Sequence, residues 1–178
     1  MAFMANRRSL VLDGSLGYVV VAIVEERDGI LSGISESVEF HQPILQRIDD
    51  ILSGSTGRHE ATEVVVGSGP GSYTGLRIAA AAAAGIAAGL SIPLRVSASD
   101  RALWNALGVK HSLPLGARES LEISSVGATV VRRDDASPVP TREQTREVFA
   151  CALARNAGPE VPFVTLQYPA PARGSNGQ

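Results

Sequence analysis

The sequence has few aromatic residues and no excess of charge of either sign. Its 178 residues include only 4 Phe, 3 Tyr and 1 Trp, so stacking platforms for single-stranded nucleic acid are not expected. The 16 Lys and Arg residues nearly balance 18 Asp and Glu residues, and the formal charge of −2 excludes a domain that coats nucleic acid through a basic surface. With 44% hydrophobic residues, the chain has material for a core built mainly from Ala, Val, Leu and Ile.

Cysteine and long apolar runs are also scarce. The single cysteine, Cys151, excludes an intramolecular disulfide and a cysteine-based zinc site. No apolar segment of a secretory signal follows Arg7 and Arg8. The longest uncharged run, residues 78–94, is rich in Ala and Gly and is broken by Pro93, which is typical of a soluble helix. We therefore predict a cytoplasmic protein with no membrane contact.

The apolar pattern of the first hundred residues predicts three strands followed by alternating helices and strands. The spacing predicts strands over 9–12, 18–24 and 30–40, a helix over 43–52, a strand over 64–66, a helix over 75–90, a strand over 93–96 and a helix over 97–107, begun by a capping cluster at 97–100. This order is that of the ribonuclease-H-like, actin-like ATPase fold. The predicted class is α/β, with a mixed five-stranded sheet covered by helices.

The signal weakens beyond Gly108. Short strands are expected over 113–115, 120–124 and 128–132, then a helix over 141–156 with Gln144 at a capping-box position, and a last strand over 161–167. The predicted organisation is an N-terminal lobe over 1–100, a shortened C-terminal lobe over 101–168 and a flexible tail over 169–178.

A glycine-rich loop joins the predicted strand at 64–66 to the following helix. Two interpretations are open: a nest of backbone amides that cradles an anion, or a tight turn that packs the helix against the sheet. The loop lacks the Gly-Lys-Ser/Thr of a P-loop, and its spacing is not that of the dinucleotide fingerprint. Its candidate site residues are Gly67, Gly69, Pro70, Gly71, Ser72, Tyr73, Thr74 and Gly75.

Residues 67–78 (GSGPGSYTGLRI) and 92–97 (IPLRVS), with an Ala-rich helix between them, resemble the signature of the TsaB (YeaZ) family. The opening strand, residues 10–13, and residues 41–52 are also similar to this family. The resemblance covers about residues 9–107. Later, residues 115–119 (LGARE) resemble an Asp-Ala-Arg stretch of the family, but Gly116 replaces the acid.

The resemblance implies the non-catalytic dimerisation subunit of bacterial tRNA threonylcarbamoyladenosine synthase. It implies an actin-like fold whose nucleotide machinery has decayed, with no cofactor and no metal. The implied partners are a TsaD-type catalytic paralogue and a TsaE-type ATPase, with tRNA contacted only through the complex. A homodimer of the isolated subunit is left open.

Asp13 is the candidate for a remnant nucleotide site. Actin-like kinases place a magnesium-associated acid in a D-x-G-[ST] loop at this point, but residues 13–17 (DGSLG) lack that register. We expect a turn-capping aspartate rather than magnesium chemistry.

The histidines do not form a metal site in the sequence. The catalytic paralogue's metal rests on an H-x-x-x-H pair, whereas Leu45 stands four residues after His41. His41 is expected to flank a helix, and His59 and His111 are expected at the surface.

The helix after the glycine-rich loop is the predicted interaction surface. One stripe is suited to the sheet: Leu76, Ala79, Ala83, Ile86 and Leu90. Small residues form another face, which leaves room for a second helix. The alternative is that this face packs on the chain's own first helix. The predicted partner interface is Arg77, Ala81, Gly85 and Gly89.

Two classes of function follow from these patterns. The favoured class is a scaffold that binds and activates a catalytic paralogue in tRNA modification, and the alternative is an ATP-dependent enzyme of the actin-like kinase type. A glycoprotease-like peptidase is least favoured, because no zinc-protease or nucleophile-elbow motif is present and Cys151 lies in a predicted helix between alanines.

Overall fold

A mixed five-stranded sheet organises the chain in the computed structural model, which describes residues 7–39, 41–53, 61–115, 118–139 and 141–169. The strand order is β3-β2-β1-β4-β5, with β1–β3 antiparallel and β4 and β5 parallel to β1. This order and the element sequence confirm the predicted actin-like fold class. The strands are β1 (Arg7–Asp13), β2 (Val19–Arg27), β3 (Ile30–Val38), β4 (Glu63–Gly67) and β5 (Leu94–Ser97).

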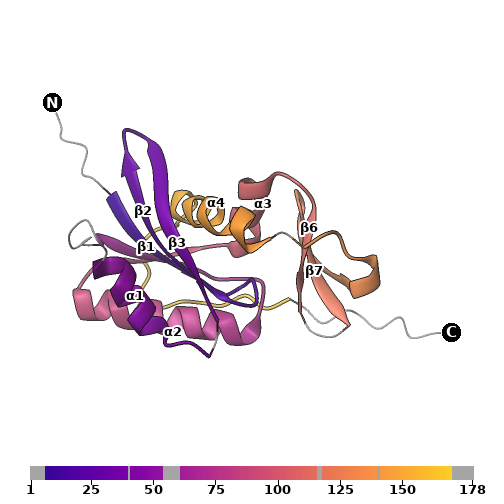
Figure 1. Ribbon diagram of the computed structural model, residues 1–178, viewed down its shortest axis with the longest axis horizontal. Helices are drawn as coiled ribbons and strands as arrows, with labels where there is room; N and C mark the ends of the chain where they lie inside the picture. The colour runs from indigo at the N-terminus through magenta and orange to yellow at the C-terminus, as the bar shows by residue number, and fades with distance from the viewer. Residues whose placement is uncertain (1–6, 40, 54–60, 116–117, 140, 170–178) are drawn as a thin grey trace.

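Helices cover both faces of this sheet (Figure 1). On one face lie α1 (Ile44–Ser53) and α2 (Tyr73–Leu90), and on the other α3 (Ser99–Leu107) and α4 (Arg142–Arg155). Neighbouring residues of β1 and β4 point to opposite faces, so Leu10 and Val64 join the core under α1 and α2, whereas Val11 and Val65 join the core under α3 and α4. Burial on both faces explains why these strands are continuous apolar runs.

A second, three-stranded antiparallel sheet follows α3. Its strands are β6 (His111–Pro114), β7 (Glu119–Ser124) and β8 (Gly127–Arg132), and a 3-10 turn at Arg133–Asp135 precedes α4. Leu113, Leu121 and Ile123 extend the core beneath α3 and α4. Although α3 begins only at Ser99 and α4 at Arg142, both helices share a core with β1 and β4 of the first sheet.

The C-terminal segment differs from the prediction. The last strand expected over 161–167 is wrong, because this stretch follows the edge of β5 with one isolated bridge, between Arg95 and Glu160. Pro162 interrupts the segment and has no amide hydrogen for a ladder. The backbone amide of Val161 still donates to the Leu94 carbonyl at 2.9 Å.

Helix α2 packs on the sheet through a face that rotates along its length. Leu76, Ala79 and Ala83 are buried as predicted, but Leu90 is 53% exposed, and Ala87 takes its place toward the sheet. The expected stripe is wrong at Leu90, because this side chain borders the groove between α1 and α2 and does not face the sheet. By length and composition alone α2 is apolar enough to cross a membrane. Its buried residues pack against the sheet.

Glu63, at the start of β4, joins four parts of the chain. Its Oε1 accepts from Ser9 Oγ at 2.6 Å and from Arg7 Nε at 2.7 Å, and its Oε2 accepts from Arg95 Nε at 2.8 Å. The two arginines also donate to backbone carbonyls of Ala154 and of the segment after α4. Burial disfavours the charged carboxylate, but the Ser9 and Arg7 hydrogen bonds and the arginine charges outweigh it and lower the pKa of Glu63.

We expect Glu63→Gln to lower the free energy of unfolding by about 1–3 kcal/mol at neutral pH, because two partly buried guanidinium groups lose their counter-charge. The pKa of Glu63 is lower in the folded state than its unfolded-state value of 4.5. The stabilisation is therefore present above pH 4.5 and is lost as the pH falls through the folded-state pKa. Denaturant unfolding of the wild type and of Glu63→Gln at pH 7 and pH 3.5 measures the difference in their free energies of unfolding. Asp50→Asn, which removes an exposed pair with Arg47, is the control and should change little. A constant difference between wild type and Glu63→Gln across this pH range would contradict the assignment.

Candidate functional site

The candidate site lies where the loops after β1 and β4 meet, at the carboxyl ends of neighbouring strands. Ligands of open α/β sheets bind at this edge. Asp13, the last residue of β1, is fully buried there. Its Oδ1 accepts from the Ser15 amide at 2.7 Å and the Ser15 hydroxyl at 2.5 Å, and its Oδ2 accepts from Ser99 Oγ at 2.6 Å. The prediction of a turn-capping aspartate is confirmed.

Burial raises the pKa of Asp13, while the hydrogen bonds from Ser15 and Ser99 act in the opposite direction. Ser99 belongs to the cluster that was expected to cap α3, and that expectation is wrong. The cap residue is Ala98, which makes no side-chain hydrogen bond, and Ser99 Oγ instead links Asp13 to the glycine-rich loop by accepting from the Gly69 amide at 2.9 Å.

Three glycines permit the two loops to touch. A Cβ atom on Gly14 would clash with the Gly75 carbonyl, and one on Gly67 would clash with the Asp13 carboxylate. A Cβ atom on Gly71 would lie 2.5 Å from Ser15 Cα. The glycines therefore provide close approach of backbone to backbone rather than an open cavity.

Several amides of the glycine-rich loop are already bonded within the chain. Ser68 N donates to the Ser97 carbonyl at 2.9 Å, and Ser72 N donates to the Ser15 carbonyl at 3.0 Å. Gly75 N donates to Ser72 Oγ at 3.4 Å, which caps α2. Together with the Gly69 amide, these contacts favour the tight turn over the anion nest.

The segment after α4 lies over the same loop, a contact that the sequence analysis missed. Gln167 N donates to the Ser68 carbonyl at 2.7 Å, and Gly69, at φ +90°, leaves room for the Gln167 carbonyl. The Tyr168 ring lies 4.9 Å from the Tyr73 ring between centroids. No local motif in residues 158–168 signals this path, because it depends on where α4 ends.

These residues do not fit a magnesium nucleotide. Both carboxylate oxygens of Asp13 are occupied by hydrogen bonds within the chain, and Gly14 and Gly71 sit against backbone where a phosphate would need space. Among the residues that the structure describes, no three His, Cys, Asp or Glu side chains gather to hold a metal ion.

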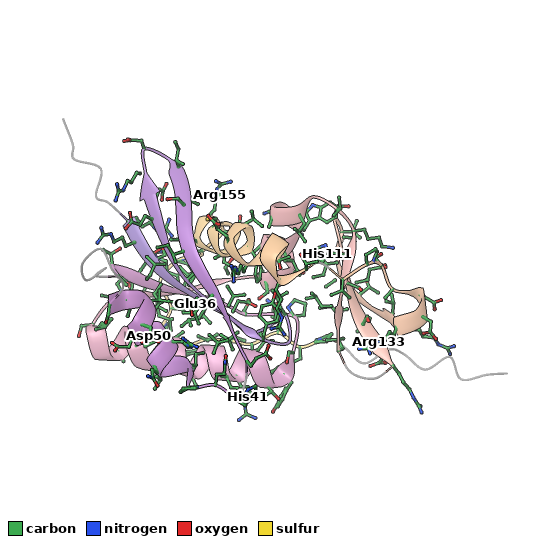
Figure 2. All side chains as sticks on the ribbon, in the orientation of Figure 1. Glu36, His41, Asp50, His111, Arg133 and Arg155 are labelled. Carbon is green, nitrogen blue, oxygen red and sulfur yellow. The ribbon has the colours of Figure 1, made fainter. Side chains whose placement is uncertain are left out.

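The histidines lie in unlike places. Figure 2 shows His41 at the surface before α1, as expected for a flanking residue, and His111 within the fold. The expected surface position of His111 is wrong: it is 3% exposed, its Nδ1 lies 2.8 Å from the Val109 carbonyl, and burial lowers its pKa. It is buried because it begins β6 and pairs with Ile123 of β7. His59 and Gly116 lie outside the described residues.

The outer face of α2 is the second candidate surface. Arg77, Ala81, Gly85 and Gly89 are all exposed along it, and a Cβ atom on Gly85 or Gly89 would meet no atom within 4 Å. Arg77 donates to the Tyr73 hydroxyl at 2.7 Å, so the arginine and the aromatic pair adjoin.

A groove of about 360 Å³ runs between α1 and α2 beside this face. Its exposed apolar rim includes Leu45, 63% exposed, and Leu90. Gly89 lines the groove next to α1, whereas Gly85 points away from the chain's own helices.

Comparison with known proteins agrees with this geometry. The model of a family described as TsaD, tRNA N6-adenosine threonylcarbamoyltransferase, matches residues 36–112. The structure of YeaZ from Pseudomonas aeruginosa is similar, with 20% identity, a TM-score of 0.53, and coverage of 77% of this chain and 73% of YeaZ. A second structure, described as an uncharacterized protein with similarity to peptidase YEAZ from Pseudomonas aeruginosa, has 19% identity and a TM-score of 0.49, and the match covers 76% of this chain and 70% of that one. A search of curated proteins found no match.

The sheet order and the YeaZ likeness define a protein of the actin-like ATPase fold class. Within that class the fold of the chain is similar to that of YeaZ, which agrees with the resemblance predicted from residues 67–78.

Two glycine substitutions test the contact between the loops. Gly14→Ala should destabilise the isolated protein by about 2 kcal/mol or more, because its methyl group meets the Gly75 backbone and cannot be accommodated by a rotamer change. Gly85→Ala, the matched control on open helix surface, should stabilise it by about 1 kcal/mol. Thermal and urea unfolding measure both. Equal stability of the two variants would show that the loops do not require close approach.

Proposed function

We propose that this protein is the non-catalytic subunit that binds and activates a TsaD-type paralogue during formation of threonylcarbamoyladenosine at position 37 of tRNA. The observation that carries the proposal is the outer face of α2, where small exposed residues adjoin an apolar groove. The closed contact around Asp13 supports a role other than catalysis.

The α2 face has the properties of a helix-docking surface. Gly85 and Ala81 carry little or no side chain, so a partner helix can approach the α2 backbone closely. Leu45 and Leu90 border the groove next to it and offer apolar area at its edge. Tyr73 and Arg77 stand at the N-terminal end of the face, and both residue types are enriched among residues that dominate binding energy.

The match to the TsaD family model supports the proposed class of partner. The TsaD family model matches residues 36–112, a range that contains both α1 and α2. A catalytic paralogue would thus present helices of the same kind, and pairs of similar helices pack readily against each other with short side chains at the crossing.

The further parts of the proposal concern the complex. A formal charge of −2 gives this subunit no net positive charge to favour tRNA binding on its own, which supports tRNA contact through the complex. A TsaE-type ATPase is the further partner, and the complex works in the cytoplasm.

The variant Gly85→Leu tests the partner surface. It should abolish co-purification with a TsaD-type paralogue, because the leucine holds the two helices apart. The isolated variant should melt at or above the wild-type temperature, since Gly85 faces open space and leucine favours helix. The control, Arg101→Leu, adds an exposed leucine on α3 at the opposite face and should leave binding unchanged. A Gly85→Leu protein that folds and still binds its partner would place the interface elsewhere.

The alternative function, an ATP-dependent enzyme, predicts turnover in the isolated protein. We expect no ATP hydrolysis above background with magnesium, because the Asp13 oxygens are engaged by Ser15 and Ser99. Phosphate release should be measured over a range of protein concentrations for the wild type and for Asp13→Asn, with melting curves as the folding check. Turnover that scales with protein concentration and disappears in a folded Asp13→Asn variant would establish the alternative.

A further inference from the structure

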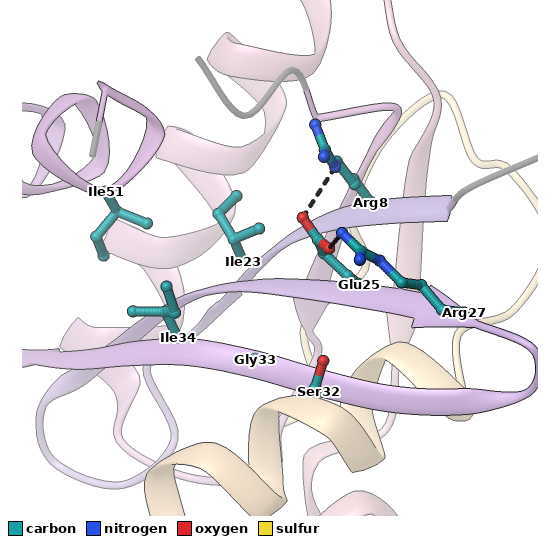
Figure 3. A pocket seen from close by; sticks show the side chains of 8 residues that line it. All are labelled: Arg8, Ile23, Glu25, Arg27, Ser32, Gly33, Ile34 and Ile51. Atoms are coloured by element: carbon teal, nitrogen blue, oxygen red, sulfur yellow. Dashed lines mark hydrogen bonds and ion pairs between the residues drawn. The ribbon is translucent and has the colours of Figure 1, made fainter. Parts of the chain in front are cut away.

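A hollow of about 450 Å³ lies on the sheet beyond the end of α1, away from both the α2 face and the Asp13 contact. Figure 3 shows charged side chains at one side of it, on β1 and β2, and isoleucines at the other. Its volume lies within the usual range for sites of small organic ligands. The function proposed above makes no use of this hollow.

The charged side holds two guanidinium groups and one carboxylate. Glu25 Oε1 lies 2.9 Å from Arg8 Nε, and Glu25 Oε2 lies 2.7 Å from Nη2 of the Arg27 guanidinium group. The side chain of Glu25 is 16% exposed and that of Arg27 is 66% exposed, so the carboxylate is shielded while the second guanidinium reaches solvent. The cluster has a net charge of +1.

The apolar side consists of Ile23, Ile34 and Ile51. Ile23 is nearly buried in the sheet, and Ile51 closes the hollow from α1. Ile34, on the edge strand β3, is 66% exposed. A large apolar side chain exposed beside a hollow provides area that a ligand would remove from water.

The strand register places these two sides next to each other. Ile23 pairs with Ile34, and two residues further along the same face Glu25 pairs with Ser32. Side chains two apart on a strand share a face, so the isoleucine pair and the ion cluster are consecutive rows of one sheet surface. The rows are adjacent because β2 continues past the core into charged residues while keeping its alternation.

We propose that this hollow binds a small organic carboxylate with an aliphatic body. The ligand carboxylate would pair with Arg27 and Arg8, because the geometry of a guanidinium group suits a carboxylate. The aliphatic chain of the ligand would cover Ile34 and Ile51. Because Glu25 already neutralises one arginine, binding is modest, and removal of the Glu25 charge strengthens it.

Titration of the full chain with sodium octanoate, followed by calorimetry or by ligand-observed NMR, tests the proposal. The wild type should bind octanoate and should bind octylammonium at least tenfold more weakly. Arg27→Gln should weaken octanoate binding about fivefold, Ile34→Ser about threefold, and Glu25→Gln should tighten it several-fold. The controls Arg47→Gln and Ile30→Ser, exposed positions outside the lining, should leave it unchanged.

A melting curve first shows that each variant is folded. Glu25→Gln is expected to bind octanoate more tightly than the wild type, and partial unfolding cannot produce a gain in affinity. Equal affinity for octanoate and octylammonium, no detectable octanoate binding at millimolar concentration, or weaker binding in Glu25→Gln would each overturn the proposal. None of these outcomes bears on the α2 interface, which the Gly85→Leu experiment tests separately.

Discussion

Asp13 accepts hydrogen bonds from two segments that are far apart in the sequence, and the arrangement of the site follows from this contact. Through Ser15 it shapes the turn after β1, and through Ser99 it holds the start of α3. Ser99 in turn receives the Gly69 amide, which brings the glycine-rich loop into the same network. A buried carboxylate with three donors is favourable only while all three remain in place, so the two loops and α3 constrain one another.

The glycines make this contact sterically feasible and thereby decide what the site can hold. With Gly14 against Gly75 and Gly71 against Ser15, the two loops are in backbone contact at the carboxyl ends of β1 and β4. The segment ending at Tyr168 adds a further layer over the loop. The same packing sets the start of α2, whose outer face then points to solvent. The closed contact around Asp13 and the exposed outer face of α2 therefore both follow from the packing of these loops.

Much of the fold could be predicted because its signals are local. The β-branched stretch that becomes β2 and the Val64–Val66 run of β4 are too apolar for anything but buried strands, and the spacing of Ile48 and Ile51 defines the inner face of α1. Leu90 was misplaced because helical periodicity does not distinguish a side chain that faces the sheet from one that borders a neighbouring helix. His111 was misplaced because a polar residue in an unpatterned stretch gives no sign that a second sheet will bury it.

The sequence by itself determined the element order as far as α4, the class of fold, the family resemblance and the turn-capping role of Asp13, because each depends on residues close together in the chain. Tertiary structure decided which function each polar or small residue serves. Ser99 bonds to Asp13 instead of capping α3, Gly85 faces open space while Gly89 lines a groove, and residues 161–167 cross the glycine-rich loop without forming a strand. These outcomes depend on distances between segments separated by tens of residues, which periodicity and spacing along the chain do not encode.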